Sequence, residues 1–142
     1  MTITFKFYHD AAGTQEITSG NPIFSSDEMG SPVPADKQIW FMSLSTGRRI
    51  KVKANPGVAQ ISINVHDLGS GGTEPSTAVK LATSQAGLAA ATGGAALNIG
   101  TQVNSLAANA VTFWCRLTNA VAADSSNTNL ELKTNELNDY VL

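Results

Sequence analysis

The chain has 142 residues, of which 42% are hydrophobic and 14% charged, and its formal net charge is −2. This length suits one compact domain, so we expect residues 1–142 to form a single folding unit. The low charge provides no broad positive field, which argues against a nucleic-acid binder, and no stretch approaches the roughly 20 apolar residues of a membrane span.

Polar but uncharged residues dominate the rest of the composition. Thr, Ser and Asn together account for 38 of the 142 residues. Ser and Asn favour turns, and Thr suits a half-buried strand, so this mixture favours strands joined by turns over helices. The single cysteine, Cys115, excludes an internal disulfide, and the small number of surface charges makes self-association or assembly a reasonable expectation.

Alternation of apolar and polar residues predicts the strands of the first half. Residues 3–7 predict a strand with one buried face, and residues 15–18 a shorter one. Residues 37–45 have apolar side chains on both faces, which predicts a strand inside a sheet with Trp40 in the core. We expect this strand to form a hairpin with residues 49–53, and a further strand at residues 61–65.

In the second half, the clearest alternation is at residues 111–118, where Val111, Phe113, Cys115 and Leu117 share one side. Shorter strands are predicted at residues 78–83 and 97–99, and the final strand at residues 129–134. Residues 102–109 are expected to form a loop. Residues 84–92 are rich in alanine, but Gly87, Gly93 and Gly94 limit any helix there to one or two turns.

These elements predict an all-β protein. Many short strands punctuated by turns, with at most one short helix near residues 84–92, are typical of an antiparallel two-sheet β-sandwich.

No set of residues predicts an enzyme or a cofactor site. His9 and His66 each precede an aspartate, but adjacent side chains on a strand point to opposite faces, so neither pair makes contact within itself. A zinc site shared by both histidines is the weaker alternative to solvated strand ends. We therefore expect no catalytic residue, no bound metal and no cofactor.

Two exposed strand faces are candidate contact surfaces. Arg49, Lys51 and Lys53 alternate with Ile50 and Val52, which predicts a basic face for an acidic neighbour or phosphate. The alternative is a solvated face whose lysines protect a sheet edge from aggregation.

The second surface lies on the predicted strand at residues 111–118. Trp114 shares its side with Thr112 and Arg116, opposite the apolar residues of that strand. Trp and Arg are enriched where protein interfaces bind most strongly, so these three residues are a candidate subunit interface. Packing under a loop is the alternative.

The C-terminal half resembles small sandwich proteins of tailed-bacteriophage virions. The resemblance rests on LATSQAGL (residues 81–88), ANAVTFWCRLT (residues 108–118) and the LELKTN strand (residues 130–135), with a weaker similarity in residues 37–54. It departs from that group at Gly93-Gly94, where a proline is expected before the glycine. The resemblance implies an immunoglobulin-like fold and a place in the virion, either in the tail and baseplate or as a head decoration.

The resulting functional prediction is a non-enzymatic virion structural protein. It would assemble in the host cytoplasm, as a homo-oligomer within the particle, with other virion proteins and copies of itself as partners. The alternative is a carbohydrate- or receptor-binding module at a virion tip.

Overall fold

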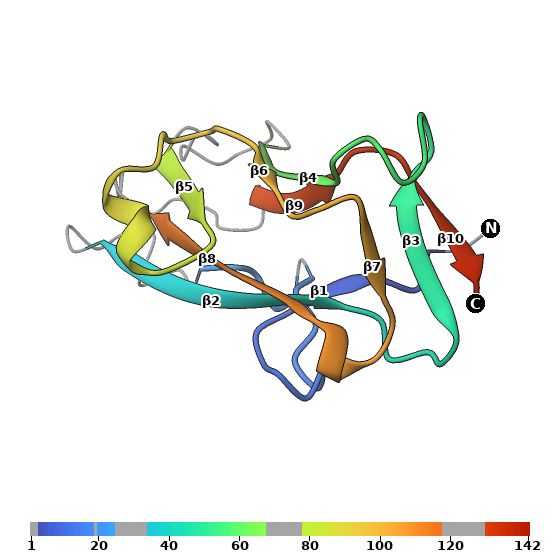
Figure 1. The fold of residues 1–142 in the computed structure, drawn as a ribbon. Helices are drawn as coiled ribbons and strands as arrows, with labels where there is room; N and C mark the ends of the chain where they lie inside the picture. Colours follow the sequence, from blue (N-terminus) through green and yellow to red (C-terminus); the bar gives the residue numbers. More distant parts are fainter. Residues whose placement is uncertain (1–2, 19, 25–33, 68–77, 118–129) are drawn as a thin grey trace.

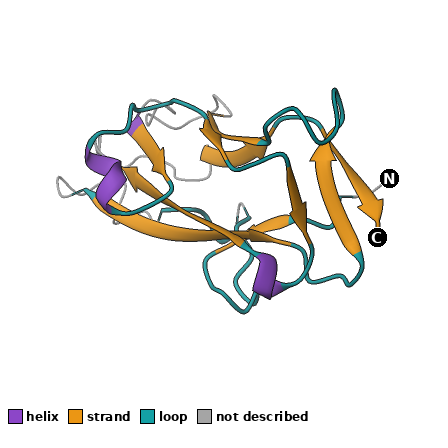
Figure 2. Cartoon of the chain, in the orientation of Figure 1, coloured by secondary structure: helices purple, strands orange, loops and turns teal. Residues whose placement is uncertain are grey.

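The computed structural model describes residues 3–18, 20–24, 34–67, 78–117 and 130–142, and it shows an all-β protein (Figures 1 and 2). The described residues form β1 (Lys6–Tyr8), β2 (Ala35–Met42), β3 (Arg48–Val52), β4 (Ser62–Asp67), β5 (Val79–Ala82), β6 (Leu97–Asn98), β7 (Gln102–Asn104), β8 (Val111–Leu117), β9 (Leu130–Thr134) and β10 (Leu137–Val141). No helix among these residues has the length and apolar character needed to cross a bilayer.

Short 3-10 helices interrupt the strands in the described part of the chain, and two of them are complete there. The first, η2 (Ala86–Ala89), lies within the segment where the sequence predicts at most one short helix. The second, η3 (Ala107–Asn109), is a single turn in the predicted loop and exceeds that limit. The Asn109 side chain donates a hydrogen bond to the carbonyl oxygen of Ser105 at 2.7 Å, and this bond closes the turn locally.

The strands pair in three antiparallel sheets, ordered β1-β2-β8-β5, β10-β3-β7 and β6-β4-β9. The all-β prediction is therefore confirmed. The described residues make three hydrogen-bonded sheets where the sequence predicts two layers, and the sandwich arrangement stays a prediction.

The pair β2 and β8 forms the middle of the four-stranded sheet, as the apolar character of both strands predicts. Its register places Ile39 opposite Phe113 and Lys37 opposite Cys115. Successive side chains point to opposite faces, so Ile39, Phe113 and Cys115 all point inward, and each is fully buried. The predicted inward side of this strand is confirmed over residues 111–117.

One hydrophobic cluster joins all three sheets. Phe41 of β2, Ile50 of β3 and Ile63 of β4 belong to it, and each is at most 2% exposed. Phe41 is flanked by two aromatic rings, with ring centroids 4.7 Å from Phe7 and 5.8 Å from Phe5. Phe7 lies directly opposite Phe41 in the register, so this contact also fixes how β1 pairs with β2.

The predicted hairpin between residues 37–45 and 49–53 is wrong. β3 pairs with β10 and β7, whereas β2 pairs with β1 and β8, so the turn carries the chain from one sheet to another. The buried Ser43 fixes this crossing, because its hydroxyl donates to Thr4 Oγ1 at 2.8 Å and its carbonyl accepts from Leu106 N at 2.7 Å. The Ser43 carbonyl, which a hairpin could use, is therefore taken by Leu106, a residue distant in sequence.

Gly47 gives this crossing its shape, because its φ of 68° lies in the left-handed region. We expect Gly47→Ala to lower the free energy of unfolding by about 1–2 kcal/mol, since an L side chain is strained there although the space around it is open. Gly47→Asn should cost less, because Asn tolerates this conformation. Urea unfolding of the three proteins measures the difference, and equal stability of Gly47→Ala and the parent would contradict it.

Two strands fall where the sequence predicts none. β7 lies in the predicted loop at residues 102–109, where Val103 is the one buried apolar side chain. β10 follows the predicted final strand, and its inward position is occupied by Asp139 rather than an apolar residue. Both strands lack the apolar alternation on which the prediction depends.

Asp139 is fully buried and connects three segments of the chain. Its carboxylate accepts hydrogen bonds from Thr4 N at 2.8 Å, Thr4 Oγ1 at 2.7 Å and Arg48 Nε at 2.7 Å. Burial by itself raises the pKa of Asp139, but these hydrogen bonds and the charge of Arg48 together lower it below its ordinary value. The network ties the N-terminal segment and β3 to β10, at the end of the molecule where the C-terminus lies (Figure 1).

Candidate functional site

The face of the four-stranded sheet that points away from the core carries both tryptophans. In the β2–β8 register Gln38 lies opposite Trp114 and Trp40 opposite Thr112, so all four share one face. We call these four residues the tryptophan face. Trp40 and Trp114 are diagonal neighbours, each half-buried and outside the core cluster, and Thr112 is exposed. The prediction that Trp40 is a core residue is therefore wrong.

An ion pair borders the tryptophan face. Arg116 of β8 forms a two-pronged pair with Asp36 of β2, with Nε 2.7 Å from Oδ1 and Nη2 3.0 Å from Oδ2. Gln85, next to η2, adds a hydrogen bond to Asp36 Oδ2 at 3.2 Å. Arg116 is thus on the predicted side of β8, but its guanidinium is held by a neighbouring strand.

The environment of Asp36 keeps this pair ionised. Hydrogen bonds from Arg116 lower the pKa of Asp36, against the opposing effect of burial, and the Gln85 amide lowers it further. Charge-assisted, two-pronged contacts of this kind fix geometry as well as charge. The pair therefore gives one end of the tryptophan face a rigid border with no net charge.

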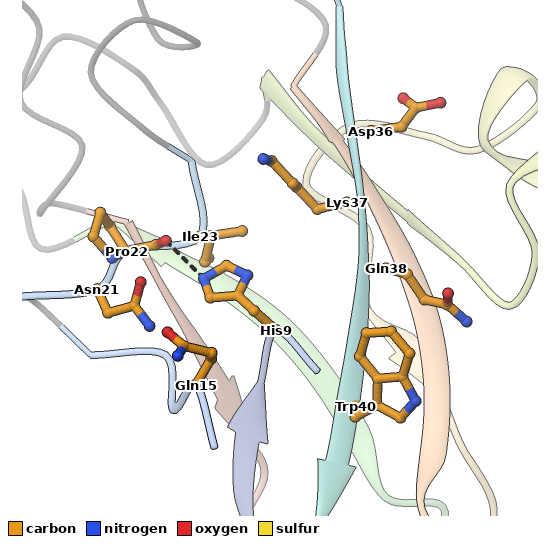
Figure 3. A pocket seen from close by; sticks show the side chains of 9 residues that line it. All are labelled: His9, Gln15, Asn21, Pro22, Ile23, Asp36, Lys37, Gln38 and Trp40. Atoms are coloured by element: carbon orange, nitrogen blue, oxygen red, sulfur yellow. Dashed lines mark hydrogen bonds between the residues drawn. The ribbon is translucent and has the colours of Figure 1, made fainter. Parts of the chain in front are cut away.

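A pocket of about 520 Å³ crosses β2 beside the tryptophan face (Figure 3). It lies beyond the end of β1, whose pairing with β2 stops at Tyr8 and Trp40. Figure 3 shows His9, Gln15 and Asn21 on one side of β2 and Gln38 and Trp40 on the other. The lining comprises nine described residues: His9, Gln15, Asn21, Pro22, Ile23, Asp36, Lys37, Gln38 and Trp40.

Local hydrogen bonds hold the N-terminal wall of this pocket. Asp10 accepts from the backbone N–H groups of Thr14 and Gln15, at 3.0 and 2.9 Å from its Oδ1, and from the Thr14 hydroxyl at 2.7 Å from its Oδ2. His9 Nε2 lies 2.9 Å from the carbonyl oxygen of Pro22. Asn21 Nδ2 donates to the carbonyl oxygen of Glu16 at 2.9 Å. These bonds fix the loop at residues 10–15 and hold the segments around His9 and Asn21 to each other.

The predicted basic face forms on the outer side of β3, and each of its three cations has a neighbour. Arg49 Nε donates to Asn104 Oδ1 at 2.7 Å, Lys51 Nζ lies 5.9 Å from the Tyr140 ring centroid, and Lys53 Nζ lies 3.6 Å from Glu136 Oε2. Ile50 and Val52 are buried as predicted. β3 is the central strand of its sheet, so the alternative of lysines that protect an edge is wrong.

The two histidines lie on different parts of the structure. His9 lines the pocket, whereas His66 is exposed on β4, in another sheet and opposite Glu131. The described residues contain no group of three His, Cys, Asp or Glu side chains that could hold a metal ion.

Comparisons with protein-family models, with curated proteins and with solved structures find no match to this chain. The tryptophan face and the pocket beside it are therefore the features from which a function is inferred.

The outward residues of β8 were predicted from the sequence, whereas the pocket was not. Trp114, Thr112 and Arg116 lie on the outward side that the alternation predicts. The pocket was missed, because its walls come from separate segments that only the pairing of β1 with β2 brings together. Residues 39–42 are apolar on both sides, and this pattern led to the wrong prediction of Trp40 as a core residue.

Proposed function

We propose that this protein is a non-enzymatic structural component of a tailed-bacteriophage virion, in the tail and baseplate region or on the capsid surface. It docks on neighbouring virion proteins, including copies of itself, through Thr112, Trp114 and Arg116. The observation that carries the proposal is the half-buried Trp114, which lies beside Thr112 and Arg116 on the outward face of the four-stranded sheet. The resemblance of the C-terminal half to virion sandwich proteins provides the biological setting.

The chemistry of this face suits a protein partner. A tryptophan that is half-buried in the free protein has apolar surface left to bury, and it loses little conformational entropy on binding because its packing already restrains it. Arg116 is held in place by Asp36 before any partner arrives. A fixed aromatic beside a fixed guanidinium is the composition typical of the strongest contacts in protein interfaces.

Repetition in a particle makes a small face sufficient. One sheet face of this size supplies a modest contact, but symmetric copies bind simultaneously, and each bound copy raises the effective concentration at the next contact. The low surface charge fits this role, because little charge has to be desolvated at the contacts.

Trp114→Ala should lower the incorporation of the protein into phage particles by about tenfold or more, since truncating a central interface tryptophan costs about 2 kcal/mol or more. The measurement is the copy number per particle in virions assembled with the variant as the sole source of the protein. Circular dichroism of the purified variant should match the parent, because Trp114 lies outside the core cluster.

Val58→Ala is the matched control, because Val58 is 68% exposed and lies on a turn away from the tryptophan face. It should leave incorporation unchanged. Parental copy number in particles that carry Trp114→Ala would contradict the proposed interface. The positions of neighbouring genes would separate a head location from a tail location.

A further inference from the structure

We propose that the pocket across β2 binds a neutral saccharide of two or more units, with one sugar ring stacked on the Trp40 indole and hydroxyl groups directed to His9, Gln15, Asn21 and Gln38. This site goes beyond the proposed assembly role, which uses Trp114 on the other strand. The proposal depends on the size of the pocket, on the unused hydrogen-bonding groups that line it, and on its charge.

The dimensions suit a small ligand. About 520 Å³ lies within the range of roughly 300–1,000 Å³ typical of pockets for small molecules. The pocket spans both sides of β2, so a ligand that contacts His9 and Trp40 together has to extend across the strand (Figure 3). A single sugar ring satisfies one side only, which is why we infer at least two units.

The polar groups of the N-terminal wall have capacity left for a ligand. The Pro22 carbonyl can only accept, so His9 Nε2 carries the hydrogen, and Nδ1 of the neutral ring is an acceptor. The Asn21 amide nitrogen is used by Glu16, which leaves its side-chain oxygen as an acceptor. The Gln15 amide has no hydrogen-bond partner among the described residues and offers both donor and acceptor.

On the other side of β2, Gln38 and Trp40 supply an amide and an indole. Neither side chain has a hydrogen-bond partner within the described part of the chain. The indole presents a flat apolar surface for the C–H groups of a sugar ring and an N–H donor at its edge. Mixed donors and acceptors around one aromatic ring match a ligand whose hydroxyl groups both donate and accept.

Charge favours a neutral ligand. The lining has two described charged residues, Asp36 and Lys37. Lys37 has an interaction partner of its own, and Arg116 neutralises the Asp36 carboxylate through two hydrogen bonds. An anionic ligand would have to approach this carboxylate, and a cationic ligand would compete with Arg116 for it. A neutral polyol avoids both costs.

Nuclear magnetic resonance of the indole N–H groups tests the site directly, because the chain has only two tryptophans. Trp114→Phe assigns the two signals. Lactose, maltose, cellobiose and diacetylchitobiose, each titrated to millimolar concentration, are the first probes, followed by an array of bacterial polysaccharide fragments and glycoprotein glycans that separates the two sources. We expect at least one saccharide to move the Trp40 signal and to leave the Trp114 signal in place.

Variants on both sides of β2 then test the geometry. Trp40→Ala should weaken binding about tenfold, through loss of the stacking surface. Gln15→Ala should weaken it roughly three- to tenfold, and because Gln15 is exposed this change leaves the fold intact. Gln102→Ala, an exposed glutamine on β7, is the matched control and should bind like the parent.

The result that would overturn the saccharide site is an unmoved Trp40 signal with every probe and no neutral glycan bound on the array. Equal binding by Gln15→Ala and the parent would also overturn the proposed two-sided geometry. Neither outcome bears on the assembly proposal. Trp114→Ala tests assembly by its copy number in particles and should retain saccharide binding, whereas Trp40→Ala tests saccharide binding by titration alone.

Discussion

Asp139→Ala should lower the free energy of unfolding by about 3–5 kcal/mol, the cost of removing one member of a buried ion pair. Asp139 is fully buried, and its carboxylate is the acceptor for the Thr4 backbone N–H and for Arg48 Nε, so both of these hydrogen bonds are lost in the variant. Urea unfolding at neutral pH is the measurement. Glu136→Ala is the matched control, since the Lys53–Glu136 pair is exposed and should contribute less than about 1 kcal/mol.

Lowering the pH should also show the contribution of Asp139 to stability. The pKa of Asp139 is lower in the folded protein than its ordinary value of 3.8, so the folded state binds fewer protons than the unfolded state near that pH. Its contribution to stability is complete above the ordinary value and is lost as the pH falls through the folded pKa. Asp139→Asn should therefore lose less stability than the parent on acidification. The same acid dependence in both proteins would contradict this assignment.

Phe41→Ala should cost about 3–5 kcal/mol, the usual cost of deleting a buried phenylalanine. Phe41 is 2% exposed and contacts Phe5 and Phe7, so the cavity would lie where β1 packs on β2. Thermal and urea unfolding measure the loss. Phe41→Leu keeps most of the volume and should cost less, whereas Val58→Ala at an exposed turn should stay within about 0.5 kcal/mol of the parent.

A Phe41→Ala variant as stable as Val58→Ala would contradict the position of this ring at the centre of the core. Because Phe41 also fixes the pairing of β1 with β2, the variant should disturb the Tyr8–Trp40 pair and the pocket beyond it.

Side-chain direction was predictable from the sequence wherever one face of a strand is apolar. The alternation of Ile50 and Val52, and that of Phe113 and Cys115, gave the buried faces correctly, because a one-residue slip would expose the whole set. The strand β10 could not be predicted in this way, because Asp139 occupies its buried position. A carboxylate satisfied by Thr4 and Arg48 leaves no apolar signal.

Strand partners were far less predictable. β2 and β3 are separated by a turn with a glycine, the usual signal for a hairpin, yet they belong to different sheets. The partners of β2 are decided by long-range packing of Phe7 and Phe113 against it, which no local pattern records. The pocket was not predictable for the same reason, because His9 and Trp40 become neighbours only after β1 has paired with β2.

The Asp139 carboxylate in β10 also has a kinetic consequence. Thr4 and Asp139 are 135 positions apart, so their hydrogen bonds form only after nearly the whole chain has collapsed. The entropic cost of closing such a long loop comes before the contacts that offset it, and this raises the barrier to folding. A topology dominated by such distant pairings belongs at the slow end of the range for single domains, where folding takes milliseconds to seconds.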